Sequence, residues 1–204
     1  MSSRLRLAQF VPNTEAEGPG HRFAVWAQGC PLRCPGCCNP EMLPFEGGEE
    51  WDVGALAERI LATPGLEGIS LLGGEPVAQT GALVELLRAT RLGQAKRQGS
   101  TGSLSVMLFS GYTLDELRSM GPDVQALLTR TDLLVDGRFD RTRPETKRRW
   151  VGSANQVLHF LSDRYSPDDP AFSAPNTVEI RFSKGALGVN GWPALAAALS
   201  RGQS

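Results

Sequence analysis

All four cysteines of this 204-residue chain lie within nine consecutive positions. They are Cys30, Cys34, Cys37 and Cys38. The spacing Cys-x3-Cys-x2-Cys of the first three can place three thiolates around one small centre, which leaves the last as a surplus fourth. Pro31, Pro35 and Gly36 favour a turning loop over a strand or a helix, so the backbone can curl around that centre. The cysteines therefore predict a metal or iron–sulfur loop.

Composition indicates a single domain and excludes some classes of partner. With 41% hydrophobic residues, a chain of 204 residues can bury one sizeable core. We expect residues 1–204 to form one domain, with a cysteine loop at 29–40, a core at 22–160 and an irregular extension at 161–204. The net charge of −1 gives no reason to expect nucleic acid or an anionic membrane surface as a partner.

The sequence also indicates a cytoplasmic location. The first ten residues contain no apolar signal segment, and no apolar run approaches the ~20 residues that a membrane helix requires. Four cysteines so close together cannot staple a domain of this size through disulfides. A reducing compartment therefore fits the cysteines better than an oxidising one.

Apolar patterns and turn residues predict an alternation of strands and helices. Strands are expected at an edge of the sheet over 4–10, and then at 22–28, 68–72, 104–109, 132–135 and 178–182. This alternation predicts an α/β fold with a mainly parallel sheet, arranged as an incomplete (β/α) barrel. Glycine-containing loops follow several of the strands, and in a barrel such loops meet on one rim, where active sites lie.

Capping residues locate the helices. Asp52 is expected to cap a helix over 52–62, Thr80 to cap a second helix, and Thr113 with Glu116 to form a capping box for a third. An alanine-rich helix is expected at 193–201. Loops are expected at 93–103 and 166–176.

Two kinds of centre suit the three thiolates, namely Zn²⁺ and an iron–sulfur cluster. Structural zinc prefers four ligands, and the adjacent Cys37 and Cys38 cannot easily both point at one small ion. The two histidines of the chain, His21 and His159, have no ligand partners in the sequence pattern, so we expect both to be structural. A cluster held by three cysteines leaves one iron open to a substrate or cofactor.

Further segments carry a resemblance to a known family. Gly73, Gly74, Glu75 and Pro76 follow a short apolar strand and, together with the cysteine spacing, resemble the radical S-adenosylmethionine enzymes. Segments 29–40, 110–113, 133–139 and 150–156 resemble the small activating enzymes of anaerobic ribonucleotide reductase. The resemblance covers about residues 23–156, with a weaker echo at 188–193. It implies an incomplete barrel of the radical S-adenosylmethionine type.

The resemblance implies roles for particular residues. Cys30, Cys34 and Cys37 would hold a 4Fe–4S cluster whose fourth iron binds S-adenosylmethionine. The residues that would bind this cofactor are Gly36, Cys38, Gly73, Gly74, Glu75, Pro76, Ser110, Asp136 and Arg138. Gly73 and Gly74 lack bulk, so their backbone can approach the cofactor's ammonium group. Gly36 stands where many relatives have an aromatic residue, and Cys38 is either a buried spectator or a redox-active thiol.

Some of these roles have an ordinary structural alternative. Ser110 lies in a turn that serves either cofactor contact or helix capping, because Thr113 already has a capping role. Asp136 and Arg138 either contact the ribose or carboxylate of the cofactor or lie in a solvated Asp-Gly turn. The basic segment 141–149 is either a solvated face or a surface for an acidic partner.

The function implied by the resemblance is reductive cleavage of S-adenosylmethionine, which gives a 5′-deoxyadenosyl radical. This radical would abstract hydrogen from a glycine Cα of a glycyl-radical enzyme. The expected partners are that protein and an electron donor such as flavodoxin or ferredoxin. One alternative is a radical enzyme that acts on a peptide or a small molecule. Another is an iron–sulfur or zinc-binding module without catalysis.

Overall fold

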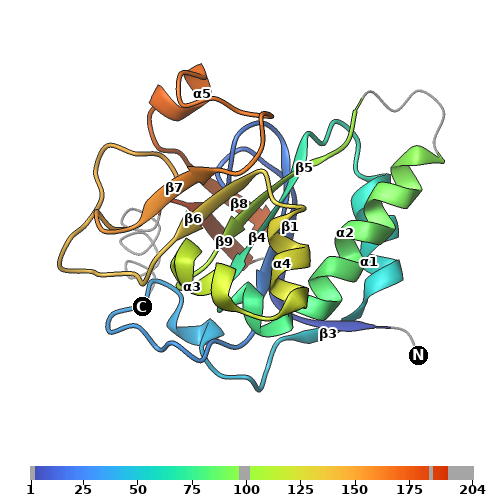
Figure 1. Ribbon diagram of the computed structural model, residues 1–204, viewed down its shortest axis with the longest axis horizontal. Helices are drawn as coiled ribbons and strands as arrows, with labels where there is room; N and C mark the ends of the chain where they lie inside the picture. The colour runs from blue at the N-terminus through green and yellow to red at the C-terminus, as the bar shows by residue number, and fades with distance from the viewer. Residues whose placement is uncertain (1–2, 97–101, 184–185, 193–204) are drawn as a thin grey trace.

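A seven-stranded sheet forms the centre of the protein (Figure 1). The computed structural model describes residues 3–96, 102–183 and 186–192. The strands of the sheet are β1 (Arg4–Thr14), β2 (Arg22–Ala27), β3 (Glu49–Asp52), β4 (Gly68–Gly73), β5 (Ser105–Phe109), β6 (Leu133–Asp136) and β7 (Val157–Phe160). Their spatial order is β3-β1-β2-β4-β5-β6-β7.

The central strands run parallel, and the outer strands do not. Neighbours among β2, β4, β5 and β6 pair in parallel, whereas β1, β3 and β7 pair antiparallel. The mixed α/β fold with a mainly parallel central sheet is thus confirmed. In the described part of the chain, the sheet ends at β3 and β7, so no closed barrel is present.

The prediction that residues 4–10 form an edge strand is wrong. β1 continues to Thr14 and lies between β2 and β3, so the edge belongs to β3. β3 was not predicted from the sequence, because Glu49 and Glu50 give this four-residue strand little strand propensity. The carboxylate of Glu50 holds the neighbouring strand through Arg6, with 2.6 Å between Arg6 Nη2 and Glu50 Oε1.

Four helices cover one face of the sheet. They are α1 (Val53–Ala62), α2 (Thr80–Ala95), α3 (Leu114–Ser119) and α4 (Pro122–Leu128). Their apolar sides form the largest buried cluster together with alternate residues of the central strands, such as Phe23, Leu71 and Leu108. Figure 1 shows α1 and α2 side by side. The alternation of strands with amphipathic helices produces this layer because each needs the other to bury its apolar face.

The caps of three helices test the sequence analysis directly. Asp52 accepts a hydrogen bond from Ala55 N at the start of α1, and Thr113 and Glu116 form the expected capping box of α3. The prediction for Thr80 is wrong, because Thr80 is the first residue of α2 and its hydroxyl donates to Val77 O. A 3-10 helix, η2 (Pro76–Gln79), leads directly into α2. The predicted loop at 93–103 begins too early, since α2 continues to Ala95.

The opposite face of the sheet is covered by the last part of the chain. Met107, Leu133 and Val135 pack there against Trp150 and Val151. Partly buried side chains from 158–172, including the short helix α5 (Pro170–Ser173), extend this packing, although 166–176 was predicted to be a loop. The predicted strand at 178–182 is β8 (Val178–Ser183), which pairs with β9 (Ala186–Gly191) in a separate two-stranded sheet. The predicted helix at 193–201 lies outside the described residues.

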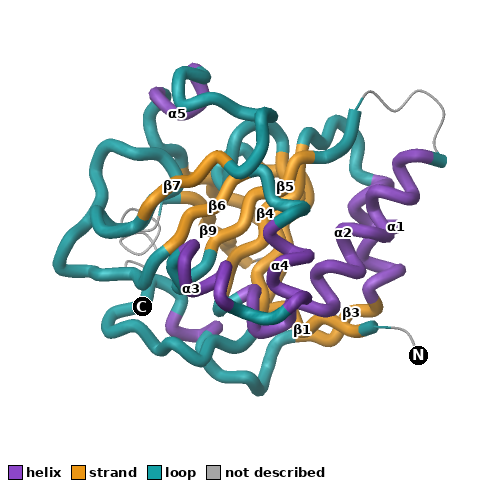
Figure 2. The backbone as a smooth tube through the Cα atoms, viewed as in Figure 1, coloured by secondary structure: helices purple, strands orange, loops and turns teal. Residues whose placement is uncertain are grey.

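The loops after β2, β4 and β5 are the ones that concern function. Because these strands are parallel neighbours, their carboxyl ends lie at the same edge of the sheet. Figure 2 shows long loops running along the lower part of the view, including the 3-10 helix η1 (Pro40–Met42). The cysteine loop (29–40), the glycine turn (73–76) and the turn after β5 therefore lie next to one another at this edge of the sheet.

Candidate iron–sulfur site

The cysteine loop leaves the carboxyl end of β2 and is fixed at its start. Gly29 N donates to Met42 O at 2.9 Å, and Cys30 N donates to Leu43 O at 3.0 Å. Cys30 is buried, whereas the other three cysteines are half-buried, and all four are free. The loop thus presents thiols at the surface and anchors its first cysteine inside.

The conformation of the loop between Cys34 and Cys37 depends on Gly36 and on a backbone hydrogen bond. Gly36 has a φ of +70°, and a Cβ at this position would collide with Cδ of Arg141, whose side chain lies against the loop. Cys37 N donates to Cys34 O at 3.1 Å and closes a tight turn. The positive φ therefore favours glycine at position 36, and a side chain there would also displace Arg141.

The thiols of Cys37 and Cys38 have different proton affinities. A hydrogen bond with the Cys38 thiol lowers the pKa of Cys37, and Asn39 N, which lies 3.4 Å from Cys37 Sγ, lowers it further. The same hydrogen bond, together with burial, raises the pKa of Cys38. Burial also raises the pKa of Cys30. The two thiols share one hydrogen bond, so the titration of one depends on the other, and the choice of Cys38 as the surplus cysteine stays a prediction.

The cysteine loop supplies its free thiols from one short segment of the chain. Thiolates are the usual ligands of iron–sulfur clusters, in which each iron takes one of them, so this donor set fits such a cluster.

The predicted glycine turn packs directly against the start of the cysteine loop. Gly73 has a φ of +107°, and a Cβ there would lie 2.6 Å from Ala27 N. A Cβ at Gly74 would overlap Gly29 O and lie 2.7 Å from Met42 O. Glu75 N donates to Gly29 O at 2.9 Å. Both glycines are thus required by close backbone contact with the segment that carries Cys30.

The side chain of Glu75 joins this turn to the turn after β5. It is 1% exposed and accepts hydrogen bonds from Val77 N at 3.0 Å, Gly111 N at 2.8 Å and Ser110 Oγ at 3.0 Å. Burial raises the pKa of Glu75 to about 7, against the lowering effect of these donors. Pro76, also buried, begins η2. The carboxylate therefore links the glycine turn to the turn after β5 by hydrogen bonds.

The turn after β5 also touches the cysteine loop. A Cβ at Gly111 would overlap Cδ1 of Leu32, so the Leu32 side chain rests on this glycine. Ser110 is buried, and its hydroxyl both donates to Glu75 and accepts from Tyr112 N at 3.1 Å. The three loops thus form one connected assembly, and the sequence alone had no signal for the contact of Leu32 with Gly111.

Asp136 ends β6 next to the turn after β5, since Ser110 N donates to Val135 O and Gly137 N donates to Tyr112 O. It is buried and accepts a hydrogen bond from Leu114 N at the start of α3, and its Oδ2 lies 3.0 Å from His159 Nε2. The side chain thus points to the face of the sheet that the helices cover. The second histidine, His21, lies 2.8 Å from Asn13 Oδ1 and 3.1 Å from Glu15 Oε1.

Arg138 is exposed, and its guanidinium forms two hydrogen bonds with Glu116, at 2.9 and 3.0 Å. This pair lowers the pKa of Glu116 to about 2 and raises that of Arg138. In the basic segment 141–149, Arg148 donates to the Glu145 carboxylate and to Gln156 O, and Arg149 donates to Ala171 O in α5. The side chain of Arg141 lies against Gly36 of the cysteine loop.

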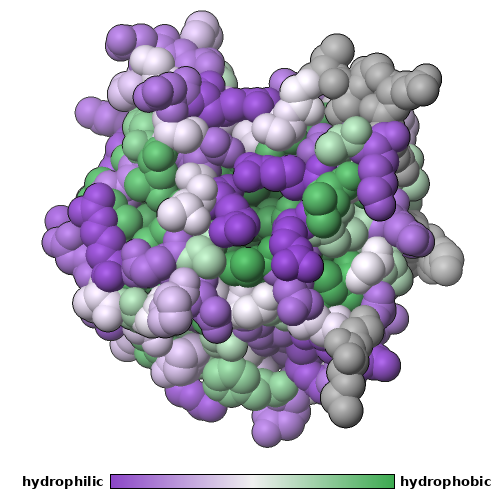
Figure 3. All heavy atoms as spheres, turned by 45° about the vertical axis from the view of Figure 1, so that its right-hand side comes forward, coloured by the Kyte–Doolittle hydropathy of each residue, from purple (hydrophilic) through white to green (hydrophobic). Residues whose placement is uncertain are grey.

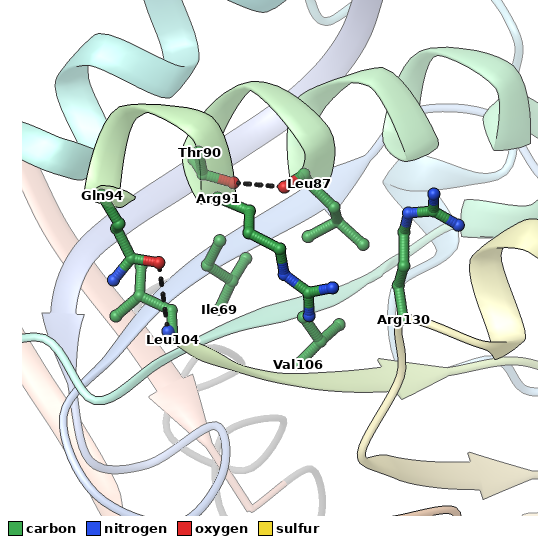
Figure 4. Close-up of a pocket in the computed structure, with 8 residues that line it drawn as sticks. All are labelled: Ile69, Leu87, Thr90, Arg91, Gln94, Leu104, Val106 and Arg130. Carbon is green, nitrogen blue, oxygen red and sulfur yellow. Dashed lines mark hydrogen bonds between the residues drawn. The ribbon is translucent and has the colours of Figure 1, made fainter. Parts of the chain in front are cut away.

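The hollow in Figure 4 lies elsewhere on the molecule. It is formed by the second half of α2 and by the amino-terminal ends of β4 and β5, the end opposite to the cysteine loop. Arg91 and Arg130 extend over a floor that contains Ile69 and Val106. On the face turned forward in Figure 3, apolar patches are separated by hydrophilic side chains. The hollow contains none of the predicted site residues.

Comparison with known proteins identifies the domain. The sequence profile of the 4Fe-4S single cluster domain matches residues 16–159. The chain belongs to this family. The match contains the three connected loops and all four central parallel strands, and it ends within β7, before α5, β8 and β9.

Curated relatives of the chain are proteins that activate anaerobic ribonucleoside-triphosphate reductase. An anaerobic ribonucleoside-triphosphate reductase-activating protein of Vibrio cholerae is 31% identical over 158 residues, which are 74% of this chain and 95% of the relative. The protein of the same description from Escherichia coli K12 is 30% identical over 158 residues, 75% of this chain and 97% of the relative. The protein of the same description from Enterobacteria phage T4 is 26% identical over 162 residues, which are 76% of this chain and 94% of the relative. These relatives confirm the resemblance to the reductase-activating proteins.

No described helix has the length and apolar character to span a membrane.

Proposed function

We propose that this chain is a radical S-adenosylmethionine enzyme that activates an anaerobic ribonucleotide reductase by removing hydrogen from a glycine Cα. The observation that carries the proposal is the connected assembly of cysteine loop, glycine turn and β5 turn, in a chain whose relatives are reductase-activating proteins. The mainly parallel sheet, open at both edges, supports an incomplete barrel of the radical S-adenosylmethionine type. Free thiols support a cytoplasmic location.

Cys30, Cys34 and Cys37 would hold the 4Fe–4S cluster. When bound, the cluster and S-adenosylmethionine supply reductive cleavage of a carbon–sulfur bond and the radical that abstracts hydrogen. The protein's own contribution is to fix the loop, since the hydrogen bonds of Gly29 and Cys30 hold its first residues at the end of β2.

The backbone, more than the side chains, would bind the cofactor. Gly73 and Gly74 lie against Ala27 and Gly29, so their peptide groups are next to Cys30. The peptide groups of Gly36 and Cys38 flank the third thiol. The side chains of Glu75, Ser110 and Asp136 already make the hydrogen bonds that hold the loops and α3, so we assign them positioning roles. For Arg138, exposed and paired with Glu116, we keep a role in binding the cofactor carboxylate as a proposal.

Two protein partners follow from this function. One is the reductase that receives the radical. The other is an electron donor of the flavodoxin or ferredoxin type, since the cluster must be reduced in every turnover. Arg141, which lies on the cysteine loop, supplies positive charge where an acidic donor would approach.

Cysteine variants test the assignment of the ligands. Cys30→Ser, Cys34→Ser and Cys37→Ser should each lose most iron and sulfide after anaerobic reconstitution, whereas Cys38→Ser should retain both. Iron and sulfide analysis and absorption spectra provide the measurement. Retention of a full cluster by Cys34→Ser together with its loss in Cys38→Ser would show that the ligand set is wrong.

Activity is tested with S-adenosylmethionine and a strong reductant. We expect 5′-deoxyadenosine in the absence of any partner. Addition of the anaerobic reductase encoded in the same genome should give a glycyl radical signal in electron paramagnetic resonance. No 5′-deoxyadenosine from cluster-loaded protein would contradict radical chemistry. Production of 5′-deoxyadenosine without a glycyl radical would favour a peptide or a small molecule as the substrate.

A further inference from the structure

Phe45 is a large apolar side chain that the protein leaves exposed next to the cysteine loop. Half of its surface is accessible, and within the described chain it belongs to none of the buried apolar clusters. Its ring lies on Gly29, the residue directly before Cys30. A Cβ at Gly29 would lie 2.5 Å from Cδ1 of Phe45, so a side chain there would displace the ring.

The segment that carries Phe45 is held firmly. The side-chain amide of Gln28 donates to Glu41 O at 3.2 Å and to Pro44 O at 2.7 Å. Together with the hydrogen bonds from Gly29 and Cys30, these contacts fasten residues 41–44 along the end of β2. Arg6 Nη1 fixes the far side of the segment through Gly47 O at 3.0 Å. The ring is therefore presented by a preorganised loop, which lowers the entropy lost when a partner covers it.

The sequence on both sides of Phe45 is largely exposed. Its exposed residues include Pro31, Pro35, Pro40 and Pro44, and also the charged residues Arg33, Glu41 and Glu46. A rigid aromatic residue with exposed charged residues in its segment matches the composition of protein interfaces, in which an aromatic centre is enclosed by a polar rim. We define Phe45 and these prolines as the loop rim.

We infer that the loop rim is the docking surface for the protein whose glycine is activated, with Phe45 as its principal contact. This inference rests on the proposed function. Hydrogen abstraction requires van der Waals contact between the glycine Cα and the radical, so the partner must cover the rim of the loop that holds the cluster. A small-molecule substrate would have no use for an exposed ring outside the site.

Phe45→Ala tests the inference, and Leu92→Ala is its matched control. Leu92 is 55% exposed, close to the 50% of Phe45, but it lies on α2, away from the loop. Phe45→Leu keeps an apolar side chain over Gly29. Cluster content and 5′-deoxyadenosine formation without partner are measured first, and then the dependence of glycyl radical formation on the concentration of the reductase encoded in the same genome.

We expect Phe45→Ala to raise the reductase concentration needed for half-maximal activation by about tenfold, as for an interface hot spot. Phe45→Leu should restore most of the affinity, and Leu92→Ala should match the wild type. Wild-type affinity in Phe45→Ala would overturn the inference and leave the proposed function intact. Loss of the cluster or of partner-free cleavage in both Phe45 variants would also overturn it, because the ring would then serve the loop itself. A wild-type protein that cleaves S-adenosylmethionine but forms no glycyl radical would instead refute the proposed function.

Discussion

Glu75 shows how a residue in a functional motif can act through structure. The sequence places it among the cofactor-binding residues, yet its carboxylate is buried and accepts three hydrogen bonds from neighbouring loops. A buried carboxylate is unfavourable unless its oxygens are satisfied. Glu75 therefore fixes the glycine turn relative to the turn after β5.

Removal of this carboxylate should destabilise the protein. Glu75→Ala leaves Gly111 N and Ser110 Oγ without their acceptor, and we expect the free energy of unfolding to fall by about 2–4 kcal/mol. The free energy of unfolding is measured by urea denaturation at about pH 6. Because the pKa of Glu75 is about 7, its side chain is mostly neutral at this pH, and the cost of burying a charge contributes little. Glu85→Ala, an exposed position on α2, should change stability by less than about 0.5 kcal/mol. Equal effects of the two substitutions on stability would contradict the role of Glu75 in linking the two turns.

At the scale of elements, the site is built from the loops after three parallel neighbouring strands. These loops contact each other through glycines, because the backbone of one loop occupies the space that a side chain of the next would need. Gly74 meets Gly29 O and Met42 O, and Gly111 meets Leu32. Such contacts hold the loops within a narrow range of positions, which suits a functional site whose groups must be placed precisely.

A methyl group at Gly74 should therefore separate the glycine turn from the cysteine loop. Gly74→Ala is expected to lower cluster content and to reduce the free energy of unfolding by about 2 kcal/mol or more. Gly81→Ala is the matched control, since a Cβ there has no atom within 4 Å. Gly81 lies in α2, where alanine stabilises by up to about 1 kcal/mol. Cluster content in Gly74→Ala equal to that in Gly81→Ala would show that the two loops need not touch.

The elements that were predicted correctly have strong local signals. α1 and α3 have caps with named partners, and β2, β4 and β6 are short apolar runs. β3, β7 and β9 were not predicted, because their strand character comes from pairing with a neighbouring strand. α4 was not predicted because its seven residues give too short a pattern. Within the site, the thiols and glycines were identified by type and spacing. Contacts between distant loops, such as that of Leu32 with Gly111, leave no trace in a single sequence.

At the scale of the whole molecule, the two ends of the central parallel strands differ. The connected loops lie at the carboxyl ends of these strands, and a network of buried polar groups lies at their amino-terminal ends. Arg22, fully buried at the start of β2, donates to Ile69 O at 2.6 Å and to Ser105 Oγ at 2.5 Å. The hydroxyl of Tyr165 lies 2.7 Å from Ser105 Oγ, so this network joins the sheet to the last part of the chain, beyond the family match.

Glu17 makes a second connection at that end and gives the protein a predictable pH dependence. Its carboxylate is buried under the β8–β9 hairpin and accepts from Asn190 Nδ2 at 3.3 Å, with Glu179 and Arg181 of β8 as the nearby charges. Burial raises the pKa of Glu17 from 4.5 to about 7. Because the folded protein holds this proton more tightly than the unfolded chain, the group contributes its stability below about pH 4.5 and loses it as the pH rises to about 7.

We therefore expect the free energy of unfolding to decrease between about pH 4.5 and 7 by up to about 3 kcal/mol through this group. Glu17→Gln keeps the size and one acceptor for Asn190 but has no proton to lose, so this part of the pH dependence should vanish. Urea denaturation at several pH values measures the difference between the two proteins. The 5′-deoxyadenosine yield should be unchanged, since Glu17 lies at the end of the sheet opposite to the cysteine loop. Parallel pH profiles for the two proteins would mean that the hairpin does not bury this carboxylate in solution.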